Sequence, residues 1–389
     1  MKKIVDLFAG CGGLSLGFQN AGYDIQGAFE YWDVAADCYE RNFEHPVFRV
    51  DLSDAESACT KINKLKPDII IGGPPCQDFS HAGKRIEDKR ASLTESFAQI
   101  ISNVKPRWFV MENVDRAKKS QAYAVARKIF KDTGYGLTEV VLDASLCGVP
   151  QKRKRFFCIG SLHETDNFQS EYIQTNLNEK ATTVRDYFGE TLGFEYYYRH
   201  PRNYSRRAIY SIDEPAPTMR GMNRPVPPGY PGHPGDACEV SPSVRAMTTL
   251  ERALIQTFPA NFKWLGNKTN VEQMIGNAVP VKLAEFVANA LSYHITTCKM
   301  QTTIDYSGFK YWLHQTQSLT DRSLSDTVSR LKRADLICEL NSSPDAYYIF
   351  NLEQSDKYAN LTSAVRSQIK RAVSLYTTYC SSMDAVAEG

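Results

Sequence analysis

One cysteine stands where a nucleophile would be useful. Residues 72–80 read Gly-Gly-Pro-Pro-Cys-Gln-Asp-Phe-Ser, and they follow an apolar run at 68–71 that predicts a buried strand. Cys76 therefore follows a stiff Pro-Pro turn at the carboxyl end of a strand, where α/β enzymes hold reactive groups. A lone cysteine is more commonly a small core residue, but the polar Gln77 and Asp78 after it argue against that alternative.

Two further segments carry groups that could assist a thiolate. Glu112 follows the apolar run 108–111, so partial desolvation would raise its pKa and keep it protonated. Arg155 ends the basic run 151–155, Gln-Lys-Arg-Lys-Arg, and its cation could lower the pKa of Cys76. Taken alone, Glu112 could be a helix-cap carboxylate, and the basic run could be a solvated or phosphate-facing strand.

A glycine-rich turn at 6–13, Asp-Leu-Phe-Ala-Gly-Cys-Gly-Gly, joins the first predicted strand to the first predicted helix. Glycines there let a ligand approach the backbone and the helix N-terminus. Glu30 and Asp51 follow the second and third predicted strands. The turn alone could bind nothing and each acid alone could be a solvated loop residue. Three ligating positions on successive strand ends favour an adenosine-type ligand.

Short apolar runs alternate with helical patterns over the first ~160 residues, which predicts βαβ units and a mostly parallel sheet in an α/β fold. The predicted strands lie at 3–8, 23–29, 47–50, 68–71, 107–111, 137–142 and 155–159. Helices are predicted at 14–20 and 281–293, and helical spacing recurs at 323–334 and 359–379. We expect a first domain at 1–182 completed by 270–296, a loop-rich domain at 183–269 and a helical extension at 297–389.

Composition bounds the class of protein. The 389 residues carry a net charge of +2, which neither demands nor excludes a nucleic-acid partner. Charge is uneven, however, because residues 196–234 are rich in Arg, Tyr and Pro and contain only two acids, Asp213 and Glu214. This stretch is either a nucleic-acid-binding surface or a solvated basic loop region.

No apolar run approaches the ~20 residues of a membrane span, and the start has no signal-peptide pattern, so we expect a cytoplasmic protein without a membrane partner. The ten cysteines show no Cys-x-x-Cys pair and no nearby histidine cluster, so we expect neither a disulfide framework nor a metal site.

Several of these segments resemble motifs of the DNA (cytosine-5)-methyltransferase family. They are Pro-Pro-Cys-Gln at 74–77, Glu-Asn-Val at 112–114, Gln-x-Arg-x-Arg at 151–155 and Gly-Asn-Ala-Val-Pro at 276–280. The resemblance covers residues 3–292 in the family's motif order, departs from it at Ala91, where glycine is usual, and does not reach the last ~95 residues. It implies a Rossmann-like S-adenosylmethionine-dependent methyltransferase sheet, with a smaller loop-rich target-recognition domain.

The resemblance also implies roles for single residues. Cys76 would attack C6 of cytosine, Glu112 would contact the base at N3, Arg155 would reach its O2, and Arg153 would support a loop or a phosphate. For S-adenosylmethionine, Phe8 would pack on the adenine, Glu30 would hold the ribose and Asp51 would contact the adenine edge. The full implied cofactor-binding set is Phe8, Ala9, Gly10, Gly12, Gly13, Leu14, Glu30, Tyr31, Asp51, Leu52, Pro74, Leu93, Asn277 and Ala278.

The implied function is methylation of cytosine C5 in double-stranded DNA, with the target base flipped out of a specific site. The expected DNA-contacting residues are Gln77, Ser80, Lys84, Arg85, Arg202, Arg206, Arg207, Arg220 and Arg224. Arginine content fits guanine readout, and the region resembles recognition modules for GC-rich palindromes with a central CG. We expect a monomer that works beside a restriction endonuclease. The alternatives are the tRNA-methylating branch that shares these motifs and a non-catalytic DNA-binding protein.

Overall fold

The computed structural model describes residues 2–75, 93–201, 203, 205–301, 306–317, 319–338, 340 and 346–387. Contacts divide the chain into two units, Met1–Ser292 and Tyr293–Gly389.

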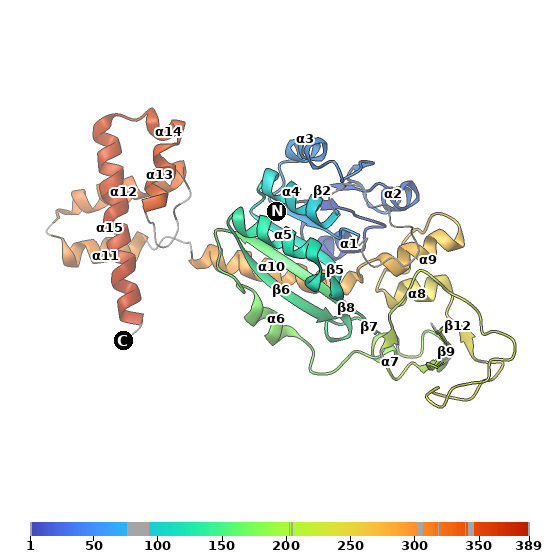
Figure 1. The fold of residues 1–389 in the computed structure, drawn as a ribbon. Helices are drawn as coiled ribbons and strands as arrows, with labels where there is room; N and C mark the ends of the chain where they lie inside the picture. The colour runs from blue at the N-terminus through green and yellow to red at the C-terminus, as the bar shows by residue number, and fades with distance from the viewer. Residues whose placement is uncertain are drawn as a thin grey trace. The chain divides into compact units, whose positions relative to one another are not determined.

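The first unit is built on a seven-stranded sheet in the order β3-β2-β1-β4-β5-β8-β6 (Figure 1). Its strands are β1 Lys3–Leu7, β2 Asp24–Phe29, β3 Val47–Phe48, β4 Ile69–Gly72, β5 Trp108–Val114, β6 Tyr135–Asp143 and β8 Lys154–Leu162. The pairs from β3 to β5 are parallel, whereas β8 pairs antiparallel with β5 and β6. This confirms the predicted α/β fold with a mostly parallel sheet.

Helices follow the parallel strands, as βαβ connections require. They are α1 Gly13–Asn20, α2 Asp33–Glu40, α3 Ala55–Leu65, α4 Leu93–Val104 and α5 Gln121–Asp132. Helix α5 shows why the sequence folds this way: the Ser120 hydroxyl caps the N–H of Tyr123, while Ala122, Ala126 and Phe130 repeat every four residues on the buried face.

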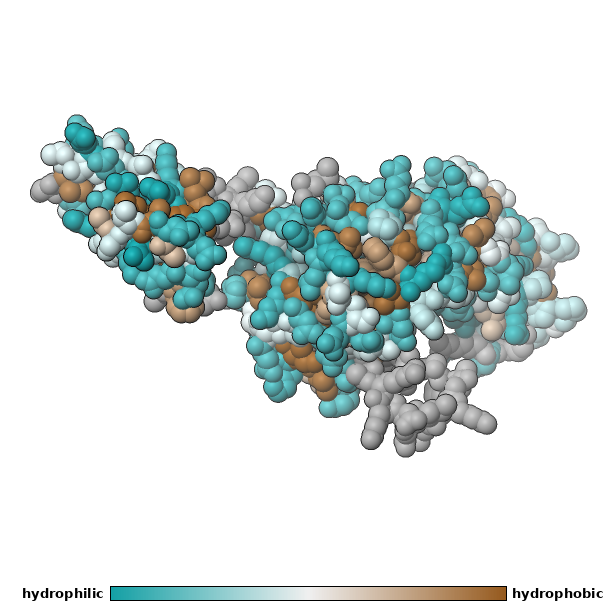
Figure 2. Space-filling model, turned by 90° about the horizontal axis from the view of Figure 1, so that it is seen from above, coloured by the Kyte–Doolittle hydropathy of each residue, from teal (hydrophilic) through white to brown (hydrophobic). Residues whose placement is uncertain are grey.

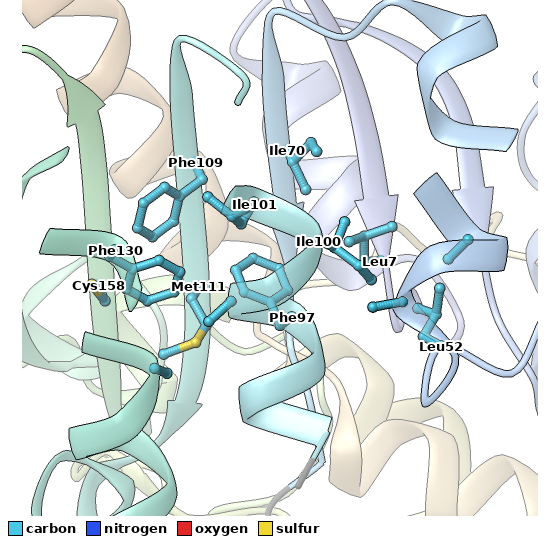
Figure 3. Packing of buried hydrophobic residues seen from close by; sticks show 14 of the residues in the cluster. Leu7, Leu52, Ile70, Phe97, Ile100, Ile101, Phe109, Met111, Phe130 and Cys158 are labelled. Carbon is cyan, nitrogen blue, oxygen red and sulfur yellow. The ribbon is translucent and has the colours of Figure 1, made fainter. Parts of the chain in front are cut away.

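One hydrophobic core lies between the sheet and helices α3, α4 and α5. Figure 3 shows Phe109 and Met111 of β5 pointing toward Phe97 of α4 and Phe130 of α5. The rings of Phe109 and Phe130 lie 4.4 Å apart. This layer fixes the strands whose carboxyl ends carry the predicted site.

The rest of the first unit consists of short strands and further helices. It contains the short strands β7 Gln151–Lys152, β9 Tyr196–Tyr198, β10 Ile209–Ser211, β11 Ala216–Pro217 and β12 Arg245–Ala246. Its helices are α6 Ser170–Asn176, α7 Val184–Phe188, α8 Thr249–Ile255, α9 Lys268–Asn277 and α10 Val281–Gln301, with 3-10 turns at Asp115–Lys119 and Ala144–Leu146. Residues of α9 and α10 pack against α1 and α2.

Some predicted boundaries are wrong. Strand β5 runs through Glu112 to Val114, rather than ending at residue 111, because each of its residues pairs with β8 as far as Arg155. Strand β3 ends at Phe48, so Asp51 lies in the loop beyond it. Helix α10 extends past residue 293, and the helical spacing at 359–379 is divided between two helices.

The described residues of the second unit form α11 Tyr306–Thr316, α12 Asp321–Ile337, α13 Ala346–Glu353, α14 Asp356–Ala359 and α15 Ser363–Ala387. They bury a core of their own, in which Phe309 packs against Tyr376 and Tyr379.

The face of the molecule in Figure 2 is mostly hydrophilic, with hydrophobic residues in small groups. Among the described helices, none combines the length and the apolar character that crossing a membrane requires.

We predict that Phe309→Ala destabilises the second unit alone by about 3–5 kcal/mol, because it removes a fully buried ring from that core. Calorimetric unfolding of the full chain should show one transition lowered and the other unchanged. The control is Leu336→Ala, whose side chain is 81% exposed and whose loss should change neither transition. One shared transition that moves as a whole would contradict separate cores.

Candidate active site

A cavity of about 550 Å³ opens at the carboxyl ends of β1, β2, β4 and β5. Thirteen of the fourteen predicted cofactor residues line it, and Gly12 is the exception. Gly12 has φ +94°, and a Cβ there would lie 2.4 Å from the ring of Phe43. Packing and backbone conformation therefore require a glycine at position 12.

The Glu30 carboxylate is hydrogen-bonded to the glycine turn at the cavity wall. One carboxylate oxygen accepts the Gly10 N–H at 2.7 Å, and the other accepts the Trp32 N–H at 2.7 Å. Burial raises the pKa of Glu30, and these N–H donors oppose the rise. Phe8 has φ +57°, a strained conformation for a residue with a side chain, held here at the cavity wall.

A segment distant in sequence completes this wall. Gly276 and Asn277, which end α9, and Ala278 and Val279, which follow it, line the cavity beside the glycine turn. A Cβ on Gly13 would lie 2.4 Å from the Val279 carbonyl oxygen, so only glycine allows this approach. Sequence reasoning placed Asn277 and Ala278 here but missed Trp32, Asn113 and Val279.

A buried hydrogen-bond chain leads away from the cavity. The Ser15 hydroxyl donates to Asp6 at 2.6 Å, the Tyr39 hydroxyl lies 2.6 Å from Ser15, and His45 Nε2 lies 2.7 Å from Tyr39. Asp6 is fully buried, lines the cavity, and its Oδ1 has no hydrogen-bond partner among the described residues. Burial raises the pKa of Asp6 to about 7.

Glu112 and Arg155 form a buried ion pair at one end of the cavity, with Arg155 Nε 2.9 Å from Glu112 Oε1. Their side chains are 10% and 13% exposed. Burial raises the pKa of Glu112, although the Arg155 guanidinium opposes this, and burial lowers the pKa of Arg155. Burial is the larger effect for both groups, because each has lost most of its contact with water.

The turn before the predicted nucleophile lies beside this pair. The Asn113 side chain donates to the Pro74 carbonyl at 3.0 Å, and Pro74 and Pro75 line the same cavity as Glu112. Cys76, Gln77, Ser80, Lys84 and Arg85 lie outside the described residues, as does Arg202.

Arg153 lies elsewhere. It is 1% exposed, and its guanidinium donates to the carbonyls of Met219, Gly276 and Ala278. The Arg153 guanidinium therefore joins the segment at Met219 to the segment at 276–278.

A second cavity of about 760 Å³ lies between the antiparallel edge of the sheet and the loop-rich region. We call it the basic cleft, because among the described residues one acid and eight cations line it: Asp115, and Arg116, Lys152, Lys154, Arg155, Arg199, Arg206, Arg207 and Arg220. Val114 and Arg155 line both cavities, so the two meet at the Glu112–Arg155 pair.

Several cleft arginines are held in place by other groups. Arg207 pairs with Glu214 and lies 4.3 Å from the centre of the Tyr210 ring, and Arg199 donates to the Thr218 carbonyl at 2.7 Å. Three of the predicted DNA-contacting arginines line the cleft, and exposed Arg224 does not. Sequence reasoning missed Arg116, whose only signal was its place two residues after Glu-Asn-Val.

Within the residues that the structure describes, no cluster of His, Cys, Asp or Glu could hold a metal ion.

Comparison with known proteins identifies a match. The family model described as C-5 cytosine-specific DNA methylase matches residues 2–293. The chain is 56% identical over 291 residues to the Type II methyltransferase M.HindV of Haemophilus influenzae, covering 74% of this chain and 96% of that protein. It is 53% identical over 300 residues to M.HgiDI of Herpetosiphon aurantiacus, covering 77% and 97%.

Solved structures agree on the fold. The S. pombe Dnmt2 methyltransferase matches with a TM-score of 0.56 and 18% identity, over 75% of this chain and 99% of that chain. Spodoptera frugiperda DNMT2 matches with a TM-score of 0.57 and 18% identity, over 75% and 100%. The family-model match ends where the second unit begins.

The buried Asp6 makes stability depend on pH. Its pKa is raised from 3.8 to about 7 in the folded chain, so its stabilising contribution is complete below pH 3.8 and lost as pH rises to about 7. Across that window we expect the free energy of unfolding of the unchanged protein to fall by about 4 kcal/mol relative to Asp6→Asn.

Denaturant unfolding at several pH values measures this difference. The Ser15 hydrogen bond lowers the pKa of Asp6. Ser15→Ala removes that bond, so the pKa of Asp6 should rise and the pH window should extend to higher pH. A difference between the unchanged protein and Asp6→Asn that stays flat with pH would refute the assignment.

Proposed function

Because the chain belongs to the C-5 cytosine-specific DNA methylase family, we propose that it methylates cytosine C5 within a specific site of duplex DNA. The observation that carries the proposal is the meeting of the two cavities at Glu112 and Arg155. A methyl donor bound in the first cavity and a base from DNA bound in the basic cleft would meet at Glu112 and Arg155.

The cofactor of this family is S-adenosylmethionine, and the residues of the first cavity fit it. The cavity volume suits a small-molecule ligand. Phe8 and Trp32 offer aromatic surface, while Glu30, Asp51 and the unpartnered oxygen of Asp6 offer acceptors for hydroxyl and amino groups. When bound, the cofactor supplies an electrophilic methyl group.

The protein's own groups would prepare the base. The Cys76 thiolate would form a bond to C6, and the electrons displaced from the ring would make C5 nucleophilic. Glu112, whose pKa burial raises, would donate a hydrogen bond or a proton to N3. After C5 takes the methyl group, a base such as water would remove the C5 proton. The electrons of that C–H bond would form the C5=C6 double bond, the C6–S bond would break to release the Cys76 thiolate, and a proton given to N3 would return to Glu112. Arg155 would contact O2 of the base.

The basic cleft supports DNA as the partner. Eight cations against one acid can neutralise several phosphates, and arginines there can read guanine in the major groove. The target base must leave the helix stack to reach Glu112, at a cost of roughly a few kcal/mol. A GC-rich palindromic site with a central CG remains our proposal for the sequence recognised.

The relatives' names as Type II methyltransferases support a protective role beside a restriction endonuclease. We propose that one monomer suffices, since base flipping acts on one strand.

Transfer of labelled methyl from S-adenosylmethionine to plasmid DNA, followed by mapping of methylated cytosines, tests the function. Label on cytosine C5 within one short repeated sequence would support it. In a parallel reaction that offers tRNA, label on tRNA and none on DNA would favour the RNA-methylating alternative. No transfer by folded, cofactor-bound protein would favour a binding-only role.

Two substitutions test the mechanism. Cys76→Ser should abolish methyl transfer, because a hydroxyl is far less ionised than a thiol at neutral pH. Glu112→Gln should lower kcat by about 10²–10⁴-fold, because it removes the proton donor. Gel-shift assays should show both variants still binding DNA. The control, Cys380→Ser, alters a cysteine of the second unit and should keep full activity.

The cleft is tested through the salt dependence of DNA binding. Arg116→Ala should reduce the slope of log K against log salt by about 0.9, as expected for one lost phosphate contact. Lys128→Ala is a matched control, because Lys128 is an exposed cation that pairs with Asp132 and lines neither cavity. Equal slopes for Arg116→Ala and the unchanged protein would remove Arg116 from the DNA interface.

A further inference from the structure

Three buried polar side chains lie between the cofactor cavity and the basic cleft. Gln151, Arg153 and Gln256 are each at most 1% exposed, and we call them the buried polar cluster. They come from β7, from the residue after β7, and from the residue after α8.

The two glutamines connect separate segments. Gln151 donates to Gln256 Oε1 at 2.6 Å and accepts the Met219 N–H at 2.8 Å. Gln256 in turn donates to the carbonyls of Ile275 at 2.5 Å and Ala278 at 3.1 Å. A continuous path of hydrogen bonds therefore joins Met219 to the end of α9.

Arg153 forms a second path between the same segments. It donates to the Met219 carbonyl at 2.9 Å, to the Gly276 carbonyl at 2.8 Å and to the Ala278 carbonyl at 3.0 Å. One planar guanidinium thus fixes both segments at once, which a lysine could not do with the same geometry.

Each segment also borders a different cavity. Gly276 and Ala278 line the cofactor cavity, whereas Thr218 and Arg220, on either side of Met219, line the basic cleft. The backbones themselves touch, since a Cβ on Gly276 would lie 2.2 Å from the backbone nitrogen of Gly221. A shift of the cofactor wall therefore cannot occur without displacing the rim of the cleft.

We propose that the buried polar cluster couples cofactor binding to duplex-DNA binding, an inference that rests on the proposed function. Its members are positioning residues. Cofactor binding restricts the motion of residues 276–279. The hydrogen bonds of the buried polar cluster then restrict residues 218–220. The arginines of the cleft are thereby positioned to contact DNA. By thermodynamic reciprocity, DNA must strengthen cofactor binding by the same factor.

Calorimetry measures this factor without turnover. The probe is S-adenosylhomocysteine, which has no methyl group to transfer, and its Kd is measured with and without saturating sheared genomic duplex DNA. For the unchanged protein we expect a ratio of the two Kd values of about five or more. For Gln256→Met, which keeps the side-chain length but removes the amide, the ratio should fall to near one.

Gln169→Met is the matched control. Gln169 is also a buried glutamine, 2% exposed, but it lines neither cavity, and its side-chain amide makes no hydrogen bond within the described part of the chain. Its substitution should leave the ratio unchanged. If the cluster only stabilised the fold, Gln256→Met would lower the unfolding temperature or both affinities while the ratio stayed at its unchanged value, and that result would overturn the proposal.

Hydrogen exchange provides a test that needs no variant, should Gln256→Met fail to fold. Binding of S-adenosylhomocysteine alone should slow exchange of the Met219 N–H, which is held by Gln151. Unchanged exchange at Met219 would overturn the proposal, as would a Kd ratio of one in the unchanged protein. Failure to bind duplex DNA at all would contradict the proposed function itself, whereas DNA binding with a ratio of one contradicts only the coupling.

Discussion

The site depends on the close approach of α1 to the chain segment that begins α10. A Cβ on Gly17 would lie 2.4 Å from that of Ala284, and one on Gly13 would lie 2.4 Å from the Val279 carbonyl oxygen. These contacts bring residues 276–279 against the turn after β1, although more than 260 residues separate them in sequence. Without two small residues on this face of α1, the cofactor cavity would lack one wall.

The competition between burial and charge sets the chemistry at the opposite wall. Glu112 and Arg155 pair across β5 and β8, where little water remains to stabilise either charge. Burial raises the pKa of Glu112, and the nearby guanidinium limits that rise. A carboxyl group whose pKa is raised by burial suits proton donation to a base and recovery of that proton later. The antiparallel pairing of β8 with β5 is what brings the two residues together.

Local sequence predicted the parts of the site that lie at strand ends. Apolar runs located β1, β2 and β4, and the glycine turn and Glu30 followed from them. Local sequence could not predict that β5 continues through Glu112, because this extension depends on pairing with β8, which is a tertiary contact. Nor could local sequence show that Arg153 is buried while Arg155 borders both cavities. Arg153 lies between β7 and β8, so the basic run is not one strand with a single alternation of faces. Arg116 was missed because the other wall of the cleft that it lines comes from residues 199–220, which are distant from it in sequence.

The most direct test of the account is covalent trapping at the predicted meeting point of donor and base. Duplex DNA in which cytosines are replaced by 5-fluorocytosine would be incubated with the protein and S-adenosylmethionine, and the protein then digested for peptide mass analysis. Fluorine at C5 cannot leave as a proton does, so the bond between sulfur and C6 should persist. The account predicts a stable adduct on the peptide that contains Cys76. Methylation of ordinary DNA with no adduct, or an adduct on a different cysteine, would contradict it.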